Sequence, residues 1–506
     1  MQDNRTAAVS KSLNVGFDNQ KYIDLQSAQI KERISKFGGK LYLEFGGKLF
    51  DDFHASRVLP GFLPDSKVNM LVSIKDVAEI VIAISAYDIE KNKLRSDIGI
   101  TYDLEVLRLI DSFRDRGLYV SCVVVTHYSN QKSADAFCNR LRSLSVRVYK
   151  HYLIDGYPSD IDLVVSEEGY GKNDYVETTR SLVVVTAPGP GSGKMAVCLS
   201  QLYHDNERGT HSGYAKFETF PIWNLPLKHP VNIAYEAATA DLDDVNMIDP
   251  FHLETYGRTA VNYNRDIEIF PVLKAIFEGI HGESPYKSPT DMGVNMAGYC
   301  ITDDETVVRA AKDEIIRRYY WTLCDRKRGA ASDNSVRKME LLMKQAGVGT
   351  EDRKVAMAVH SHPSVQEMPV VAISLPDGTI VTGKTSALLA ATSAMMLNAL
   401  KNLAGINDSM HLISPSVIEP VQDLKTKYLG DRGASLHASE MLIALSVCAT
   451  TNPVATAVLE RLPELRGCEA HSSVILPDDD EELMRKLGIH VTCDPKYGSD
   501  RLFQGR

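Results

Sequence analysis

Residues 188–194, with the sequence Pro-Gly-Pro-Gly-Ser-Gly-Lys, have the types and order suited to holding a phosphate group. They follow the apolar run 183–185 and precede residues with helical spacing, so a buried strand is expected to turn into a helix here. In such a turn, backbone N–H groups and the helix N-terminus converge on one place and stabilise an anion. A lysine adds a point charge on the phosphate. We predict phosphate binding by Gly189, Gly191, Ser192, Gly193 and Lys194, and a catalytic role for Lys194.

This segment resembles a Walker A loop, and it departs from that pattern at two positions. Pro188 stands where the first Gly is expected, and Met195 replaces the Ser or Thr whose hydroxyl holds magnesium. Anion binding is therefore expected, whereas conventional ATP hydrolysis is not. A tight strand-to-helix turn at a sheet edge, with no ligand, is the alternative interpretation.

Acidic residues further along the chain are candidates for the magnesium that Met195 cannot hold. Asp241, Asp243 and Asp244 fall in a long segment rich in Tyr and Asn. Carboxylates bind Mg²⁺, so these three residues are predicted to hold the metal, with Asp241 and Asp244 also catalytic. Helix capping and loop solvation are the alternative explanation. Five cations of the same segment could neutralise ligand phosphates: Lys216, Lys228, Arg258, Arg265 and Lys287.

A second glycine pair, Gly46-Gly47, follows the apolar run 41–45. It is similar to the strand-glycine-glycine loop of amino-acid kinases. Glycine pairs after strands are common turns, however, and a turn is the favoured interpretation.

Two histidine patterns in the last third suggest zinc chemistry. His360 and His362 stand in a His-x-His-Pro sequence similar to the core of the zinc isopeptidases, where alternate imidazoles face one ion. The Ser and Asp that such enzymes need lie too far along the chain, so a polar loop is the simpler interpretation.

The second pattern joins His437 and Glu440, with Cys448 eleven residues after His437. It is similar to the cytidine-deaminase signature, which requires His-x-Glu and a second Cys that are missing here. A neutral His437 that caps a helix or lines a cleft is therefore favoured, and the same holds for His471.

The elements that position these residues follow from the periodicity of apolar side chains. The first third alternates apolar runs with helical patterns, which predicts a parallel sheet in a doubly wound α/β domain. Strands are expected at 41–45, 68–74, 118–125, 146–149 and 181–185, and helices at 27–37, 75–86, 103–116 and 134–144. Residues 208–292 lack periodicity and are expected to be irregular, lining a site or wrapping between domains.

The last third is expected to form a second α/β domain with a mixed sheet. Strands are predicted at 354–359, 370–375, 379–381, 472–476 and 489–493, and helices at 386–403, 437–449, 453–461 and 479–487. The chain is thus divided into an N-terminal α/β domain (1–207), an irregular and helical middle region (208–346) and a C-terminal α/β domain (347–506).

Composition limits the classes of function. The chain has 506 residues, a formal net charge of −10, 44% hydrophobic and 24% charged residues, as a packed globular protein shows. The negative charge argues against nucleic-acid or anionic-membrane partners. Without an apolar N-terminal run, a membrane-length apolar stretch or a Cys-x-x-Cys pair, a cytoplasmic location with reduced thiols is expected. We expect a small phosphorylated ligand or nucleotide, and a homo-oligomer.

Several segments together resemble one bacterial family over nearly the whole chain: 41–48, 185–194, 214–221, 241–251 and 288–293. That family is the domain of unknown function 1846, also called uncharacterised protein family 0371. The resemblance implies an N-terminal α/β domain, a helical middle part and a C-terminal domain similar to the deaminase-type α/β sandwich. It brings no established reaction.

Three hypotheses about function follow from these residues. The first is an enzyme of phosphoryl-transfer or phosphate-ester chemistry, with the glycine-rich loop as its phosphate site and Mg²⁺ as its metal. The second is a regulatory protein that binds a nucleotide or phosphate through the same loop without turning it over. The third is a zinc-dependent hydrolase that acts through the C-terminal domain.

Overall fold

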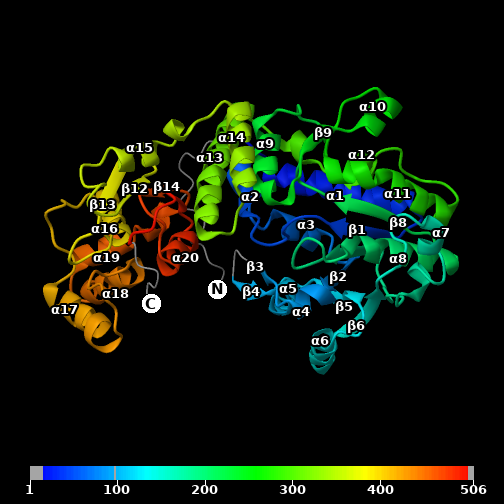
Figure 1. Cartoon of the computed structure of the whole chain (residues 1–506), viewed down its shortest axis with the longest axis horizontal. Helices are drawn as coiled ribbons and strands as arrows, with labels where there is room; N and C mark the ends of the chain where they lie inside the picture. The colour runs from blue at the N-terminus through cyan, green and yellow to red at the C-terminus, as the bar shows by residue number, and fades with distance from the viewer. Residues whose placement is uncertain (1–14, 96–98, 500–506) are drawn as a thin grey trace. The chain divides into compact units, whose positions relative to one another are not determined.

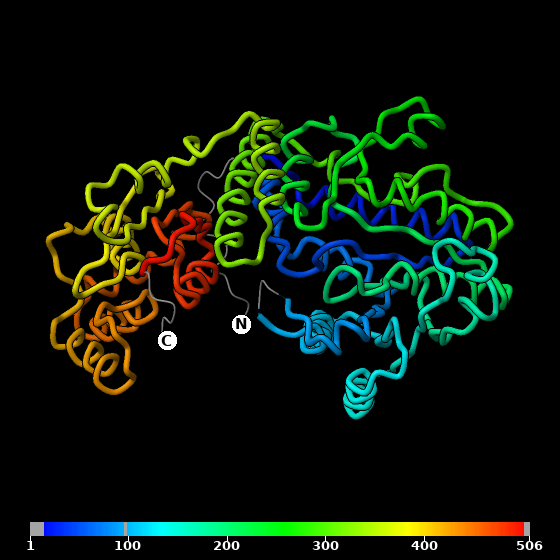
Figure 2. The backbone as a smooth tube through the Cα atoms, in the orientation of Figure 1, coloured from blue at the N-terminus to red at the C-terminus, as the bar shows by residue number. Residues whose placement is uncertain are grey.

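The computed structural model describes residues 15–95 and 99–499. The chain divides into two units, and the boundary between Ala311 and Lys312 falls inside helix α13 (Asp304–Arg328). Figure 1 labels the elements of both units and Figure 2 traces the chain through them. The predicted three-part division differs from this one, because residues 208–311 belong to the same unit as the first third of the chain.

The first unit is built on a seven-stranded parallel sheet with the order β11-β8-β1-β7-β2-β5-β6. Most strands are apolar and buried along their length, as expected for a parallel sheet covered on both faces. The strands are β1 (Leu41–Phe45), β2 (Ala78–Ser85), β5 (Tyr119–Tyr128), β6 (Arg147–Tyr152), β7 (Leu182–Thr186), β8 (Gly213–Phe217) and β11 (Gly293–Val294).

The strand order reverses direction between β1 and β7. From β1 the chain moves outward through β2, β5 and β6, returns as β7, and then crosses β1 to form β8 and β11. Parallel crossovers are right-handed, so connections that run in opposite directions place their helices on opposite faces. Open α/β sheets bind ligands at the carboxyl ends of the strands beside such a reversal. The edge formed by the ends of β1 and β7 is therefore the place to look for a site.

Helices cover both faces of the sheet. On one face, α8 (Lys194–Glu207) and α11 (Asn264–His281) share a buried apolar cluster with Tyr42, Val183 and Tyr214 of the strands. On the other side, α5 (Tyr102–Asp115) packs on β2 and β5, while α1 (Asn19–Lys36) packs on α3 (Ser66–Ser73).

The first unit also contains shorter elements. They are α2 (Phe53–Val58), α4 (Ala86–Glu90), β3 (Leu94–Arg95), β4 (Ile100–Thr101), α6 (Lys132–Ser143), α7 (Ile161–Val164), α9 (Pro230–Ala238), β9 (Asn246–Ile248), α10 (Pro250–Tyr256), β10 (Val261–Tyr263) and α12 (Pro289–Met292).

The second unit has a separate four-stranded sheet with the order β13-β12-β14-β15. The sheet is mixed, as expected: β12 (Val370–Ser374) is antiparallel to both β13 (Ile380–Lys384) and β14 (Glu469–Ser472), whereas β15 (His490–Cys493) is parallel to β14. Its helices are α14 (Asp333–Ala346), α15 (Lys354–His360), α16 (Ala391–Leu403), α17 (Pro415–Asp423), α18 (Ala438–Ala449), α19 (Pro453–Leu459) and α20 (Asp478–Lys486). The deaminase-type likeness stays a prediction.

Three predicted elements have the wrong type. Residues 68–74 lie largely in helix α3, residues 75–86 contain strand β2, and residues 354–359 lie in helix α15. All eight residues of β2 are buried. Because a fully buried strand lacks the alternation of apolar and polar residues, its sequence cannot be told from that of a buried helix by periodicity. The β-branched residues of α3 and α15 favour strands in the sequence. In the structure, Val68 and Leu71 lie on one buried face of α3, and Val355 and Val359 lie on one buried face of α15.

The segment 208–292 is more regular than predicted. It contains β8, which pairs with β1 inside the main sheet, and the 18-residue helix α11. Buried residues of α11 recur at helical spacing, among them Phe270, Leu273 and Phe277, but Pro271 lies inside the helix. Proline in a helix interior removes a hydrogen bond and argues against a helix in the sequence. Packing against the sheet outweighs that cost here.

Candidate functional site

The predicted loop lies at the carboxyl end of β7 and leads directly into α8. Gly191 and Gly193 adopt left-handed backbone conformations, with φ of 75° and 79°. A Cβ added at Gly193 would lie 3.1 Å from the side chain of Thr126, so glycine also provides the space for this turn. The side chain of Thr126 donates a hydrogen bond of 2.8 Å to the carbonyl of Ser192. The loop is thus held against the end of β5.

Ser192 is turned inward within the loop. Its side chain is fully buried, and its hydroxyl donates a hydrogen bond of 2.9 Å to the carbonyl of Gly189. Gly189 in turn packs against the ring and hydroxyl of Tyr102, which leave no space for a Cβ there. No side chain caps the N-terminus of α8, so the N–H groups of its first turn stay available to an anion.

A row of charged side chains lies on the sheet face that α8 covers. In the parallel register, Glu44 of β1 stands opposite Lys216 of β8. Both residues lie two positions beyond Tyr42 and Tyr214, whose side chains face α8, so they point to the same side. Glu44 accepts a hydrogen bond of 2.7 Å from the hydroxyl of Tyr214, and both residues are buried.

Lys194, the first residue of α8, is a partly buried cation without a bonded partner. Within residues 15–95 and 99–499, its ammonium group makes no hydrogen bond and no ion pair. Burial lowers the pKa of Lys194, and the positive charge of Lys216 acts in the same direction, whereas Glu44 opposes the shift. An anion placed beside Lys194 would relieve both effects.

Lys216 is held by two carboxylates and a tyrosine hydroxyl. Its ammonium pairs with Asp266 of α11, donates a hydrogen bond to the hydroxyl of Tyr263 at the end of β10, and lies 3.1 Å from a carboxylate oxygen of Glu218. Burial raises the pKa of Glu218 to about 7, because the charges of Asp266 and Glu44 add to the shift and Lys216 only partly offsets it. Glu218 can therefore take up or release a proton near neutral pH.

The three predicted acidic residues have different surroundings. Asp244 is almost fully buried and forms a two-point ion pair with Arg265, at 2.5 and 2.9 Å. Asp241 and Asp243 are exposed, and Asp243 has a left-handed backbone conformation. Across the described part of the chain, His360, His471 and Asp494 are the group of three whose ligand atoms lie close enough to share a metal ion.

Sequence reasoning found part of the charged row and missed the rest. Lys216 is one of the five predicted cations, and Glu44 lies in the run 41–45 before the glycine pair. No role is predicted from the sequence for Glu44, Glu218 or Asp266. The missed signal is charge inside an otherwise apolar strand, as in the sequence Tyr-Ala-Lys-Phe-Glu at 214–218. Of the other four cations, Arg265 binds Asp244, and Lys228, Arg258 and Lys287 are exposed.

The glycine pair after β1 forms a turn. The N–H of Gly46 donates a hydrogen bond of 3.1 Å to the carbonyl of Phe217, and Gly47 has a φ of 70°. Asp52 caps α2 by accepting a hydrogen bond from the N–H of Ala55, and it also pairs with the buried Lys67 at 2.7 Å. These contacts hold β1 beside β8 and explain the pair structurally.

The two histidine patterns of the second unit separate in the structure. His362 accepts a hydrogen bond of 3.1 Å from the N–H of Ser364 in its own turn, whereas His360 reaches Asp494. His437 begins α18, and the carboxylate of Glu440 accepts a hydrogen bond of 2.7 Å from its N–H. A hydrogen bond with Asp480 raises the pKa of His437. His437 and Glu440 thus form a helix cap.

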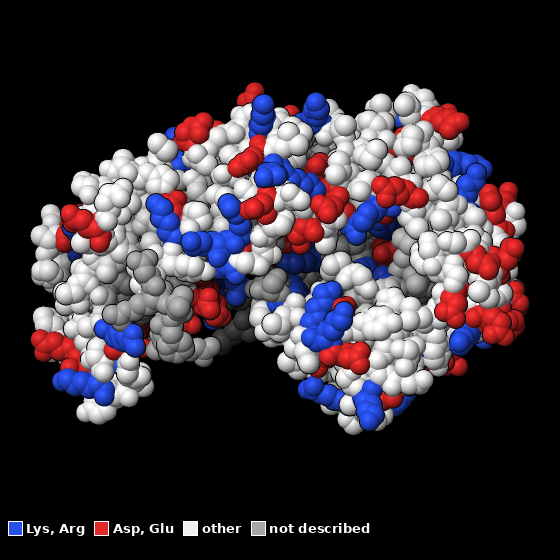
Figure 3. All heavy atoms as spheres, in the orientation of Figure 1, with Lys and Arg blue, Asp and Glu red and all other residues white. Residues whose placement is uncertain are grey.

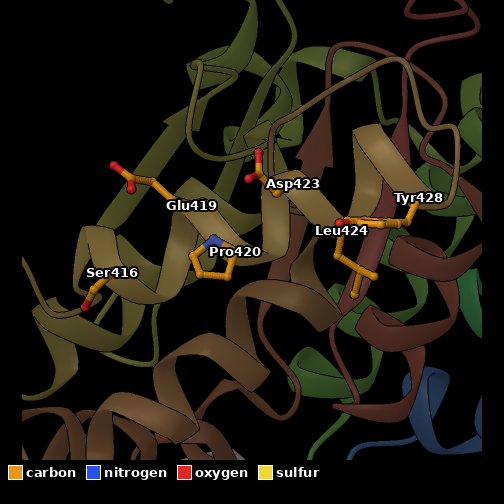
Figure 4. A pocket seen from close by; sticks show the side chains of 6 residues that line it. All are labelled: Ser416, Glu419, Pro420, Asp423, Leu424 and Tyr428. Atoms are coloured by element: carbon orange, nitrogen blue, oxygen red, sulfur yellow. The ribbon is translucent and has the colours of Figure 1, made fainter.

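The second unit also has a surface pocket. It is lined by residues of α17 and of the π-helical turn after it (Figure 4): Ser416, Glu419, Pro420, Asp423, Leu424 and Tyr428. The six lining residues include two carboxylates and no cation, so the pocket offers no complement to a phosphate.

The surface charges are of both signs. On the face shown in Figure 3, Lys and Arg side chains occur beside Asp and Glu side chains on both units. In the described segments, no helix has both the length and the apolar composition needed to cross a bilayer.

Comparison with known proteins places the whole chain in one family. Residues 15–347 match the model of the N-terminal domain of unknown function DUF1846, and residues 351–503 match its C-terminal counterpart. UPF0371 proteins of Streptococcus pneumoniae (strain JJA) and Streptococcus thermophilus (strain ATCC BAA-250 / LMG 18311) are each 57% identical over 488 residues, which cover 96% of this chain and 99% of the relative. Neither name states an activity. The chain belongs to the DUF1846 family, whose curated relatives are called UPF0371 proteins.

Proposed function

We propose that this protein binds a phosphorylated small molecule or a nucleotide at the carboxyl edge of its parallel sheet, and that it acts there in phosphoryl-transfer or phosphate-ester chemistry. The observation that carries the proposal is the ammonium group of Lys194 at the N-terminus of α8, which has no bonded partner among the described residues. A partly buried cation without a counter-charge is costly, and an anionic ligand would supply that charge.

The surroundings of Lys194 favour a phosphate over a smaller anion. The turn formed by Gly191 and Gly193 leaves the backbone open to close approach, and the first N–H groups of α8 are uncapped. Charge-assisted hydrogen bonds to such groups are about twice as strong as neutral ones. Several oxygens on one ligand can use the loop, the helix N-terminus and Lys194 at the same time.

The chemistry proposed for this edge uses Lys194 and the carboxylates of the charged row. Lys194 stabilises negative charge that develops on phosphoryl oxygens, because the cation is already oriented and partly shielded from water. Glu218, with its pKa raised to about 7, is suited to move a proton to or from the reacting group. Any Mg²⁺ would arrive with the nucleotide phosphates, and Glu44 is the carboxylate of the charged row whose charge acts on Lys194.

The second candidate is a non-catalytic protein that senses a nucleotide or phosphate through the same loop. Met195 supports it, because a thioether cannot hold magnesium as the hydroxyl of a Walker A loop does. Both candidates require the same binding step and differ only in the fate of the ligand.

The binding step is tested by thermal shift against nucleotides and sugar phosphates. A ligand at one hundred times its dissociation constant adds about 2.7 kcal/mol to the stability of the folded state. In the variant Lys194→Met, affinity should fall by about 10- to 150-fold, which corresponds to the 1.5–3 kcal/mol of a charged hydrogen bond. Lys228→Met is the matched control, because Lys228 is an exposed lysine of the same unit.

The outcomes separate the candidates. If no phosphorylated compound shifts the wild type, or if Lys194→Met and Lys228→Met bind equally well, the site proposal is wrong. A binding compound is then incubated with the protein and Mg²⁺ and followed by phosphorus NMR. Turnover that is lost in Glu218→Gln supports the enzyme, and an unchanged ligand supports the sensor.

A further inference from the structure

Two histidines and an aspartate from three separate segments meet in the second unit. His360 ends α15, His471 lies in β14, and Asp494 follows directly after β15. One ligand atom of each residue lies within 4.8 Å of the others. The Nε2 atom of His360 is 3.0 Å from both carboxylate oxygens of Asp494, and the Nε2 atom of His471 is 3.2 Å from Oδ1.

The backbone fixes two of these three residues. β14 and β15 are neighbouring parallel strands, with His471 opposite Thr492. The N–H of Asp494 donates a hydrogen bond of 2.9 Å to the carbonyl of Ser472, which continues the ladder past the end of β15. His471 is fully buried, whereas 41% of the side chain of His360 is exposed. The cluster thus has a rigid base and one side open to solvent.

The hydrogen bonds behind His471 indicate which of its nitrogens carries the proton. The hydroxyl of Thr492 accepts a hydrogen bond of 2.7 Å from Nε of Arg353 and lies 3.3 Å from the carbonyl of Ala470, to which it can donate its own proton. It then has one lone pair left for Nδ1 of His471, at 2.8 Å. All three partners of the Thr492 hydroxyl are satisfied when Nδ1 of His471 is the donor.

That assignment leaves a lone pair on Nε2 of His471 pointing at a carboxylate oxygen. Two acceptors 3.2 Å apart repel one another unless a proton or a metal cation lies between them. Histidines that bind metal ions usually donate their other ring N–H to a fixed acceptor, as Nδ1 of His471 does here.

We propose that His360, His471 and Asp494 bind a divalent transition-metal ion, with Zn²⁺ as the best fit, through the two Nε2 atoms and the carboxylate. Ligands about 2.0–2.1 Å from a tetrahedral zinc ion stand about 3.3 Å apart, close to the 3.0 and 3.2 Å between these groups. Three protein ligands leave a fourth position, on the exposed side of His360, for water or a substrate. Ferrous iron uses the same ligand types and is the competing ion.

This site differs from the zinc site that the sequence suggests. The His-x-His-Pro pattern pairs His360 with His362, whereas the structure pairs His360 with two residues more than one hundred positions away. His362 therefore separates the two hypotheses, because it lies beside His360 in the chain and outside the proposed ligand set.

The test is metal binding by the full-length protein. The wild type and the variants are stripped with a chelator, dialysed against Zn²⁺ or, without oxygen, against Fe²⁺, and analysed for bound metal. Affinity is measured by competition with a chelating dye, and the visible spectrum of the Co²⁺ form reports four-coordinate geometry. The ligand variants are His360→Ala and Asp494→Asn, and the matched control is His362→Ala. Melting curves without metal check that each variant is folded.

We expect one Zn²⁺ per chain in the wild type and in His362→Ala. Affinity should fall by more than about 100-fold in His360→Ala and Asp494→Asn, which exceeds the 10- to 100-fold cost of losing an outer partner. Thr492→Val removes only the acceptor of His471 Nδ1 and should give that smaller loss. Less than about one tenth of an equivalent of either metal in the wild type, or equal binding by His360→Ala and His362→Ala, would overturn the proposal. Preferred retention of Fe²⁺ would overturn its assignment to zinc.

Discussion

Two buried charged regions of this protein differ in how completely their charges are paired. In the second unit, Glu469 binds Arg317 at 2.6 Å and Arg353 at 2.8 Å, and Arg317 also binds Glu314 at 2.8 Å. In the first unit, Lys194 has no bonded partner in the part of the chain that the structure describes. Buried charge alone therefore does not indicate a ligand site. A cation left without its counter-charge does.

The effect of pairing is visible in the two carboxyl groups. Burial opposes the ionisation of Glu469, but the two guanidinium groups overcome it and hold the pKa well below its usual range. Burial also opposes the ionisation of Glu218. Its cation, Lys216, pairs with Asp266 as well, so the pKa of Glu218 rises to about 7. The first arrangement stabilises the fold, and the second leaves a group that titrates in the working range of an enzyme.

The largest effect is expected from breaking the paired region. Arg317→Met leaves the buried carboxylate of Glu314 and the partly buried carboxylate of Glu469 with one cation fewer, which should lower the free energy of unfolding of the second unit by about 3–5 kcal/mol. Urea unfolding is followed by the fluorescence of Trp321, whose ring N–H bonds to β15, in a Trp223→Phe background. Arg461→Met, which breaks an exposed pair with Glu464, should cost less than about 1 kcal/mol. Equal losses of stability in both variants would show that the buried ion pairs contribute no more than the exposed one.

A pH dependence of stability of intermediate size is expected from Glu218 in the first unit. Glu218 binds its proton more tightly in the folded state, with a pKa of about 7, than in an unfolded chain, where about 4.5 is usual. Between these values the folded state holds more protons, so stability falls as pH rises through this window. We expect the free energy of unfolding of the first unit to fall by about 1–3 kcal/mol between pH 5 and pH 7.5. This is less than the full difference between the two pKa values would give, because Lys216 interacts with the carboxylate of Glu218.

The control for this pH dependence is Glu218→Gln. Its side chain keeps nearly the same shape and cannot titrate, so the fall in stability between pH 5 and pH 7.5 should largely disappear. An equal fall in the variant and the wild type would show that another group is responsible. A rise in stability over the same window would contradict the sign.

A smaller effect is expected when the unpaired cation is removed. Lys194→Met replaces a partly buried charge with an apolar chain of similar length, so the free energy of unfolding without ligand should stay the same or rise by up to about 1 kcal/mol. Stability is measured by urea unfolding with the fluorescence of Trp223 in a Trp321→Phe background. A loss of more than about 1 kcal/mol would mean that Lys194 has a structural partner and resembles Arg317 after all.

The sequence contains the local part of the first site. Strand, glycine turn and helix occur in the predicted order around Gly191 and Gly193, because that information lies within about twenty neighbouring residues. The charged row required knowledge of register. Glu44 and Lys216 become neighbours only because β8 pairs with β1 on the side opposite β7. The sequence gives little sign of β8, which lies in a segment without clear periodicity.

The second site is still less local. His360, His471 and Asp494 belong to a helix, a strand and the residue after another strand, and residues 354–359 were predicted as a strand instead of a helix. The His-x-His-Pro pattern directed attention to the neighbour of His360 in sequence. Its neighbours in space follow from the pairing of β14 with β15, which short apolar runs do not specify.

The smallest effect is expected at the acidic residues that the sequence suggested as magnesium ligands. Asp241 and Asp243 are exposed, so Asp241→Asn and Asp243→Asn should change the free energy of unfolding by no more than about 0.5 kcal/mol. They should also leave the affinity for a phosphorylated ligand unchanged in the presence of Mg²⁺, whereas Glu44→Gln, in the charged row beside Lys216, should change it. Isothermal titration calorimetry with and without Mg²⁺ measures both. A Mg²⁺-dependent loss of affinity in Asp241→Asn or Asp243→Asn, but not in Glu44→Gln, would return the metal to the predicted acidic run and move the proposed chemistry away from the sheet edge.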